Sequence, residues 1–176
     1  DFGFRGTANE EGRLFNPDLG GGALLDVGVY TVSFSSMVLG TPDRITGLAQ
    51  MSDRTGVDET AAVVLGHPSG ALSLLSTAIR TNTPHEAWIL GTEGRIHIAS
   101  PWWKPDRMTV TRSGAPSEEV HMPFESSGFQ FEIAEVAQGA RAGKLESDTL
   151  PLSESVAVMR TMDTLRSQWG LKYPME

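Results

Sequence analysis

GGGALLDVGVYTVSFSSMVLGTP, residues Gly20–Pro42, is the stretch that decides the fold. Three glycines open it, an apolar run over Ala23–Leu39 follows, and Gly40 with Pro42 closes it. Glycine accepts the left-handed cap of a helix and proline cannot continue the hydrogen-bond ladder, so this pattern predicts one helix over Ala23–Leu39. Only Asp26 is charged within the run, and we therefore expect the helix to be buried on most sides, between layers of the fold.

After this helix the apolar periodicity changes to two residues, which is the period of a β-strand. The pattern predicts seven strands, at Ile45–Met51, Thr60–Leu65, Ala71–Ile79, Ala87–Leu90, Arg95–Ala99, Met108–Thr111 and Glu119–Met122. Short connections with Gly or Pro at 67–70, 92–94 and 113–116 favour antiparallel hairpins. The strand Thr60–Leu65 is apolar on both faces, which predicts a central strand with cover on both sides.

Two further helices are predicted near the end of the chain. Phe129–Arg141 is stopped by Gly143, and Glu154–Trp169 has Ser153 as its N-cap and Gly170 as its stop. The apolar stripe of the second helix is predicted to comprise Val156, Met159, Met162, Leu165 and Trp169. The order helix, strands, helices predicts an α+β fold with a predominantly antiparallel, open-faced sheet and helices on one face.

Length and composition limit the classes of function. The chain has 176 residues, 39% of them apolar, which suffices for one domain with a real core. Its formal net charge of −8 comes from 14 basic and 22 acidic residues, and no basic cluster reverses it, so nucleic acid is not expected as a partner. No cysteine is present, which excludes disulfides, thiolate metal sites and a cysteine nucleophile.

The location and extent of the protein follow from two further observations. No uninterrupted apolar run approaches the roughly 20 residues of a membrane span, and no leader pattern is visible, so we expect no membrane partner and a cytoplasmic protein. The chain starts at Asp1 and not at Met, as if it were cut from a longer polypeptide. We therefore expect a fragment of a larger protein.

Asp26 and Tyr30 are the candidate chemical residues of the first helix. Residues four apart share one helix face, and a tyrosine hydroxyl there can exchange a proton with a substrate hydroxyl. The alternative is purely structural: Asp26 complements the helix dipole and Tyr30 fills the core. Spacing alone does not decide between the two.

The glycine-led run resembles the second signature of the Gfo/Idh/MocA oxidoreductases, most of all their dimeric dihydrodiol dehydrogenase branch, in which Tyr stands where many relatives have His. The resemblance extends over essentially the whole chain. It includes Asp1–Gly3, RLFNPDL at 13–19, TGVDET at 55–60, GTEGRI at 91–96, FQFEIAEV at 129–136 and GLKYP at 170–174. Each piece is short, and the ordered set is specific.

The resemblance implies a function and its residues. Asp26 falls on the family's conserved acid and Tyr30 on its acid/base position, while Phe2, Trp103 and Phe124 are expected to line the pocket for a sugar or diol. The chain lacks the family's Glu-Lys-Pro motif and any Gly-x-Gly-x-x-Gly fingerprint. We therefore expect residues 1–176 to form a single substrate-binding and dimerisation domain, with the N-terminal Rossmann domain outside the chain.

The implied enzyme transfers hydride between a secondary alcohol and NAD or NADP, which is bound mainly by the N-terminal domain. The expected partners are that domain, a small-molecule substrate and a second copy paired through the sheet. This chain alone is expected to be inactive. The alternative is a non-catalytic binding or assembly module with the same fold, and an upstream glycine fingerprint with Glu-Lys-Pro would favour the enzyme.

The remaining candidates are weaker. Core packing is the competing explanation for each aromatic residue, least so for Trp103 in its proline-broken loop. The four histidines, His67, His85, His97 and His121, lack metal-ligand spacing, so no metal is expected. We expect structural or surface roles for them, with His85 the one most worth following.

Overall fold

The computed structural model describes all 176 residues, and the chain divides into two compact units. The first unit contains residues 1–84 and 154–176, and the second contains residues 85–153. The first unit is therefore built from two separate pieces of the chain. The two units are described one at a time below.

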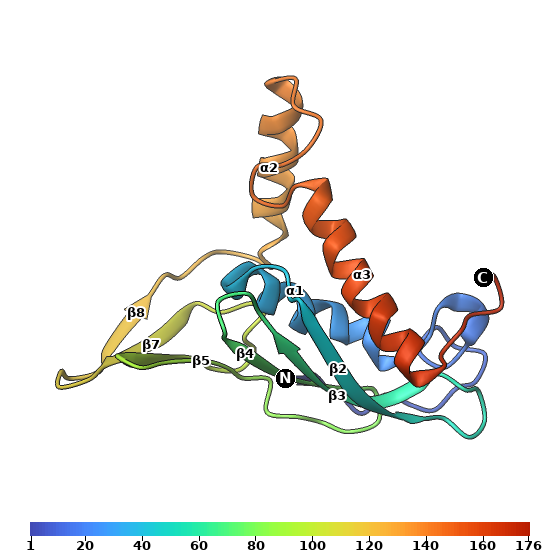
Figure 1. Ribbon diagram of the computed structural model, residues 1–176. Helices are drawn as coiled ribbons and strands as arrows, with labels where there is room; N and C mark the ends of the chain where they lie inside the picture. Colours follow the sequence, from blue (N-terminus) through green and yellow to red (C-terminus); the bar gives the residue numbers. More distant parts are fainter. The chain divides into compact units, whose positions relative to one another are not determined.

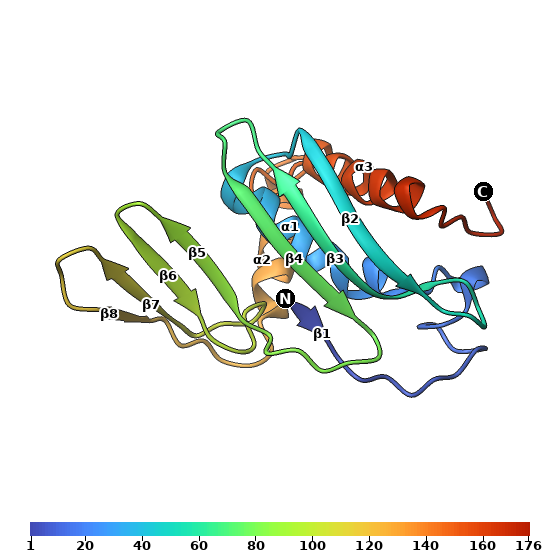
Figure 2. The ribbon, with the colours of Figure 1, turned by 60° about the horizontal axis from the view of Figure 1, so that its bottom comes forward.

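The first unit is organised on a four-stranded sheet with the order β1-β4-β3-β2. Its strands are β1 (Phe2–Gly3), β2 (Arg44–Met51), β3 (Asp58–Gly66) and β4 (Leu72–Ala78). The strands β2, β3 and β4, labelled in Figure 1, are antiparallel neighbours, whereas the short β1 runs parallel to β4 (Figure 2). The predicted strands Ile45–Met51, Thr60–Leu65 and Ala71–Ile79 are thus confirmed, and β3 is central.

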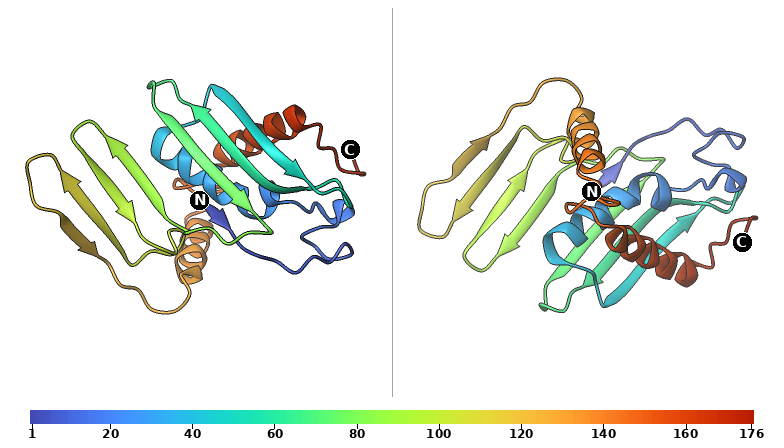
Figure 3. Two further views of the ribbon diagram at one scale, coloured as in Figure 1. Left: turned by 90° about the horizontal axis from the view of Figure 1, so that it is seen from below. Right: turned by 90° about the horizontal axis from the view of Figure 1, so that it is seen from above.

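The helices of this unit cover one face of its sheet (Figure 3, right). A 3-10 turn, η1 (Pro17–Leu19), precedes the π-helical turn η2 (Leu24–Gly28), which continues without a break into α1 (Val29–Leu39), and α3 (Leu152–Trp169) lies beside them. The main core packs helix residues against inward residues of β3, namely Leu24, Val32, Val63, Leu65, Val158, Met162 and Leu165. Alternation along β3 supplies one apolar face, and the helices bury it.

The helix predicted over Ala23–Leu39 is present, but its first turn is π and not α. The N–H of Val29 donates to the carbonyl of Leu24, five residues back, which widens the turn at the glycine-led start. The stretch is also less buried than predicted, because Tyr30, Met37 and Val38 are exposed. Pro17–Leu39 is long and apolar enough by composition alone to pass as a membrane span, yet half of its most apolar window is buried inside the unit, as in a core helix.

The other face of this sheet carries exposed apolar side chains. Leu48 on β2 and Leu74 on β4 are 81% and 80% exposed, and Val64 and Leu72 lie on the same face. The register places Val64 opposite Leu74, so these side chains form one patch. The helices cover one face of Thr60–Leu65, as predicted, and the cover predicted for its other face does not come from this chain.

The start and the buried stripe of α3 differ from prediction by a few residues. The helix begins at Leu152, so Ser153 lies inside its first turn and is not its N-cap. The buried residues are Val158, Thr161, Met162 and Leu165, while Val156 and Met159 are exposed. A stripe drawn from 3.6-residue periodicity fitted two neighbouring faces, and only packing selects one of them. The stop at Gly170, with a φ of 70°, is confirmed.

The second unit contains a separate four-stranded antiparallel meander, β5 (Ala87–Gly91), β6 (Gly94–Ile98), β7 (Arg107–Arg112) and β8 (Glu118–His121) (Figure 3, left). It is followed by α2 (Phe129–Arg141), which buries none of its residues. Every strand predicted here is confirmed. The α+β class holds for the whole chain, but the strands form two hydrogen-bonded sheets where periodicity suggested one.

Candidate functional site

The glycine-led start of the helix is closed by the side chain of Asp58. This residue is the first of β3, is 0% exposed, and its Oδ2 accepts a hydrogen bond of 2.7 Å from the N–H of Leu24. Gly22 has a φ of 117°, and a Cβ there would lie 2.2 Å from Oδ1 of Asp58. Glycine is therefore required at position 22 by its backbone conformation and by the carboxylate beside it.

A second contact fixes the same loop from the end of the chain. Tyr173 is buried, and its hydroxyl donates a 2.7 Å hydrogen bond to the carbonyl of Gly21. Its ring packs with Val57 and Leu171, and the guanidinium of Arg166 lies 4.9 Å from the ring centre. The three motifs GGGALLDVGVY, TGVDET and GLKYP thus meet at one place, which explains physically why they occur together.

Burial raises the pKa values of Asp58 and Tyr173, the two side chains that hold the glycine loop. Loss of water raises the pKa of Asp58 to about 7, although the amide dipoles of Leu24, Asp58 and Ala23 act in the opposite direction. Oδ1 of Asp58 has no hydrogen-bond partner. Burial first, and then the nearby charge of Asp58, raise the pKa of Tyr173 to about 12, so its phenol stays protonated.

Asp26 lies in the first turn of the helical stretch and is mostly shielded. Its side chain is 15% exposed and forms an ion pair with Arg13, whose own side chain is 70% exposed. The RLFNPDL segment therefore supplies the partner of the candidate acid. Asp58 accepts the N–H of Leu24 at the helix start, while Asp26 lies in the first helical turn, where a carboxylate also interacts favourably with the helix dipole.

Tyr30 stands in the first turn of α1 and reaches the surface of this chain. It is 49% exposed, and its ring lies 5.4 Å from the ring of Phe2 at an interplanar angle of 60°. Phe2 is held on β1 by pairing with Thr77 of β4. Tyr30 is thus not a buried core residue here, and one of the three predicted pocket aromatics lies directly beside it.

The other two predicted aromatics belong to the second unit. Trp103 makes edge contacts with His85 and with Trp102, with ring centres 4.8 and 6.0 Å apart. Phe124 meets the ring of Phe131 at 5.7 Å. The structure therefore groups Phe2 with Tyr30, and it places Trp103 and Phe124 in the other unit.

A buried polar network holds the opposite end of α1. His67 is 1% exposed; its Nδ1 donates to the carbonyl of Gly40 at 2.9 Å, and its Nε2 lies 3.0 Å from Oγ of Ser73. Ser35 of α1 completes the network through a 2.6 Å contact with Ser73. The structural role predicted for His67 is confirmed, and the network ties the end of α1 to β4.

Sequence reasoning did not single out Asp58, Tyr173 or Arg13. An acid opening a strand and a tyrosine after a helix carry no chemical pattern, because their partners are backbone groups more than 30 residues away. The one available signal was that all three stand inside segments that resemble the family's.

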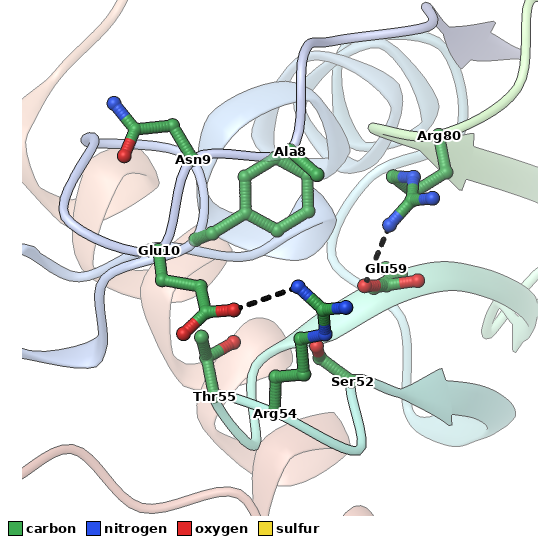
Figure 4. Close-up of a pocket in the computed structure, with 9 residues that line it drawn as sticks. Ala8, Asn9, Glu10, Ser52, Arg54, Thr55, Glu59 and Arg80 are labelled. Carbon is green, nitrogen blue, oxygen red and sulfur yellow. Dashed lines mark hydrogen bonds and ion pairs between the residues drawn. The ribbon is translucent and has the colours of Figure 1, made fainter.

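A small polar pocket lies elsewhere in the first unit (Figure 4). Its volume is about 190 Å³, and two ion pairs cross its walls, Arg54 with Glu10 at 2.9 Å and Arg80 with Glu59 at 3.3 Å. None of the predicted site residues lines it. It is smaller than the roughly 300 Å³ at which ligand pockets usually begin, and its arginines are already paired.

The fold places this chain among oxidoreductase structures. A crystal structure of aldose-aldose oxidoreductase from Caulobacter crescentus, complexed with glycerol, superimposes with a TM-score of 0.81 over 96% of this chain and 51% of that chain, at 18% identity. A 3-ketoreductase from Actinomadura kijaniata, in complex with NADP and TDP-benzene, gives 0.79 over 94% and 51%, at 20% identity. At such identities the likeness shows the fold alone.

The family is shown by sequence. The model of the GFO/IDH/MocA C-terminal domain matches residues 1–97, which is more than half of the chain, and the chain belongs to this family. Trans-1,2-dihydrobenzene-1,2-diol dehydrogenase of Xenopus laevis is 34% identical over 92% of this chain and 51% of its own length. D-xylose 1-dehydrogenase (NADP(+)) of Hypocrea jecorina is 32% identical over 92% and 47%. The chain thus spans about half the length of these relatives.

Proposed function

We propose that this chain is the substrate-binding and oligomerisation half of an NAD(P)-dependent oxidoreductase that acts on a secondary alcohol of a sugar or diol. The observation that carries the proposal is the helix start, where a shielded acid, Asp26, and an exposed tyrosine, Tyr30, stand on one helical stretch beside Phe2. The names of the relatives, a diol dehydrogenase and a xylose dehydrogenase, support the substrate class.

The glycine run of this chain is not suited to the phosphates of a dinucleotide. Phosphates bind free N–H groups at a helix start, but here a carboxylate already accepts the N–H of Leu24 and fills the space beside Gly22. We therefore assign the cofactor, NAD or NADP, mainly to an N-terminal Rossmann domain outside this chain.

The residues of this chain handle the proton and the orientation of the alcohol. When bound, the nicotinamide would take a hydride from the substrate carbon. The hydroxyl proton would pass to the phenolate form of Tyr30 or to the neutral amine of a lysine of the other domain. Asp26, held by Arg13, orients the hydroxyl, and Phe2 stacks on the substrate ring or the apolar sugar face. The pocket roles of Trp103 and Phe124 stay predictions from the family resemblance. The products are a carbonyl compound, reduced cofactor and a proton.

The test is an assay of the full-length protein with sugars and trans-diols, following reduction of NAD and NADP. Alcohol-dependent reduction supports the proposal, and its absence across both substrate classes favours the non-catalytic module. Residues 1–176 alone should show no turnover and no micromolar cofactor binding by calorimetry. Asp26→Asn in the active protein should lower kcat markedly, whereas a dipole role would cost about 1 kcal/mol of stability and little rate.

The exposed sheet face is proposed as the dimer interface, with a second copy of the chain as its occupant. Large contiguous apolar patches are rare on soluble monomers, and a two-fold pair would bury the same patch of each copy. Leu48, Val64, Leu72 and Leu74 supply it, with the guanidinium of Arg44 at its edge beside Gly66. The pairing belongs to the single substrate-binding and dimerisation domain proposed for residues 1–176, in a cytoplasmic protein.

Light scattering at micromolar concentration tests the interface. The 176-residue chain should have about twice its mass of 19.0 kDa, and Leu74→Lys should shift it to the monomer because a charge enters the patch. Leu145→Lys is the matched control, since Leu145 is 98% exposed but belongs to the second unit and not to this sheet. A monomeric wild-type chain would refute the interface.

A further inference from the structure

We propose that Asp58 is a positioning residue: together with Tyr173 it holds the Gly20–Gly22 loop and the first helical turn, and so sets where Asp26 and Tyr30 stand. The inference rests on the proposed function for its catalytic consequence. Its structural part, the hold on the helix start, stands independently of any activity.

The contacts of Asp58 converge on the segment just before the candidate residues. Leu24, whose N–H it binds, is the first residue of the π turn and lies two residues before Asp26. A cap at this N–H fixes where the helical stretch starts and therefore the rotation of every residue after it. The neighbouring Gly22 makes room for this carboxylate, because a Cβ at position 22 would lie 2.2 Å from Oδ1 of Asp58.

Tyr173 holds a second residue of the same segment from a different element. Its hydroxyl donates to the carbonyl of Gly21, so Gly21 and Leu24, three residues apart, are held by the segment after α3 and by β3 respectively. Glycine loops have many accessible backbone conformations, and an unpinned loop would let the first turn fray. A π turn has poor intrinsic stability as well, which increases the need for the hold.

Neither Asp58 nor Tyr173 forms a hydrogen bond with the side chains of the candidate residues Asp26 and Tyr30. Asp58 is fully buried, and Asp26 has its own partner in Arg13. The effect of Asp58 is thus exerted through the backbone. Because misplacement of a catalytic group by about 1 Å can cost 100-fold in rate, a loosened start should lower kcat strongly without altering cofactor binding.

The experiment compares Asp58→Ala, which removes the acceptor, with Asp58→Asn, which keeps one, in the full-length protein. Val158→Ala is the matched control, because it truncates a buried core residue of α3 in the same unit without touching the loop. Amide hydrogen exchange is followed at Leu24 and Asp26, and kcat and both KM values are measured at a temperature where all variants are folded.

We expect Asp58→Ala to lose at least 10-fold of the exchange protection at Leu24 and 10- to 100-fold of kcat, with KM for the cofactor unchanged. Asp58→Asn should retain both within about threefold, and Val158→Ala should retain both. If Asp58→Ala does not fold, Tyr173→Phe removes only the hold on Gly21 and should produce the same changes with smaller amplitude.

The outcomes separate this inference from the proposed function. Unchanged protection at Leu24 in folded Asp58→Ala, or in Tyr173→Phe where the alanine variant does not fold, overturns the hold on the helix start. Lost protection with unchanged kcat overturns the catalytic consequence. Lost protection in a protein whose wild type oxidises no sugar or diol leaves the hold supported and refutes the proposed function instead.

Discussion

The two ends of the helical stretch Leu24–Leu39 are both tied to the sheet by buried polar side chains, but in different ways. At the far end, both ring nitrogens of His67 have partners, Gly40 and Ser73. At the start, Asp58 has one bonded and one unpartnered oxygen, and burial raises its pKa. The His67 end, with its polar groups paired, has a structural role. The Asp58 end, with an unpartnered buried oxygen, lies beside the candidate chemistry.

The largest expected effect is a pH dependence of stability caused by Asp58. Its absence would contradict the difference drawn between the two ends of the helix. The pKa of Asp58 is about 7 when folded against an ordinary 3.8, so the folded state binds the proton more tightly than the unfolded state. Stability from this group is therefore present at low pH and is lost as pH rises from about 4 to 7, by about 4 kcal/mol. Asp58→Asn should remove that dependence.

Urea unfolding at pH 5 and at pH 8 provides the measurement. The difference between wild type and Asp58→Asn isolates this group, because exposed carboxylates such as Asp106 and Glu176 titrate identically in both proteins. A variant that is relatively more stable at pH 8 than at pH 5 is the expected result. Parallel pH profiles for the two proteins would show that Asp58 does not lower the free energy of unfolding as the pH rises. The two ends of the helix would then not differ in this respect.

The second effect concerns catalysis. Tyr30→Phe in the full-length enzyme removes the phenol that is proposed to carry the proton and should lower kcat by about 100-fold or more, with cofactor affinity unchanged. Steady-state kinetics with the best sugar or diol substrate measures it. Ser35→Ala, on the same helix at the satisfied end, is the control and should change kcat less than threefold. Equal losses of kcat in Tyr30→Phe and Ser35→Ala would contradict the functional difference between the two ends of the helix.

The smallest expected effect concerns the stability of the hydrogen-bond network around His67. Ser73→Ala takes one partner from Nε2 of His67 and should cost about 1 kcal/mol of unfolding free energy, since Ser35 remains 3.3 Å away as a second partner. Thermal or urea unfolding measures the loss. Activity at a temperature where the variant is folded should be that of wild type, and a large rate change would contradict the scaffold role.

Sequence patterns predicted the elements well because each depends on neighbours in the chain. Gly40 and Gly170 end helices through their own backbone conformations, and the hairpin at 67–70 closes through its own turn residues. Asp26 and Tyr30 could be selected because they belong to one short motif. Such local information survives whatever the rest of the fold does.

The features that were missed depend on distant partners. Asp58 and Tyr173 act on backbone groups of residues 21–24, and no spacing rule connects them. The buried face of α3 was misjudged because Val156 and Val158 are equally apolar, and only the sheet beneath selects the second. The π turn has the same origin, since tertiary contacts and not propensity determine it.

The interrupted course of the first unit has a consequence during synthesis on the ribosome. Its sheet and α1 are complete by residue 84, but α3 and Tyr173, which close the core and the glycine loop, emerge only after the 69 residues of the second unit. Because the ribosome adds about 5–20 residues per second, the inner apolar face of the sheet stays without α3 for several seconds. During this stage Asp26 and Tyr30 are already synthesised, but Tyr173, which binds Gly21, is not. The uncovered apolar face is then accessible to chaperones.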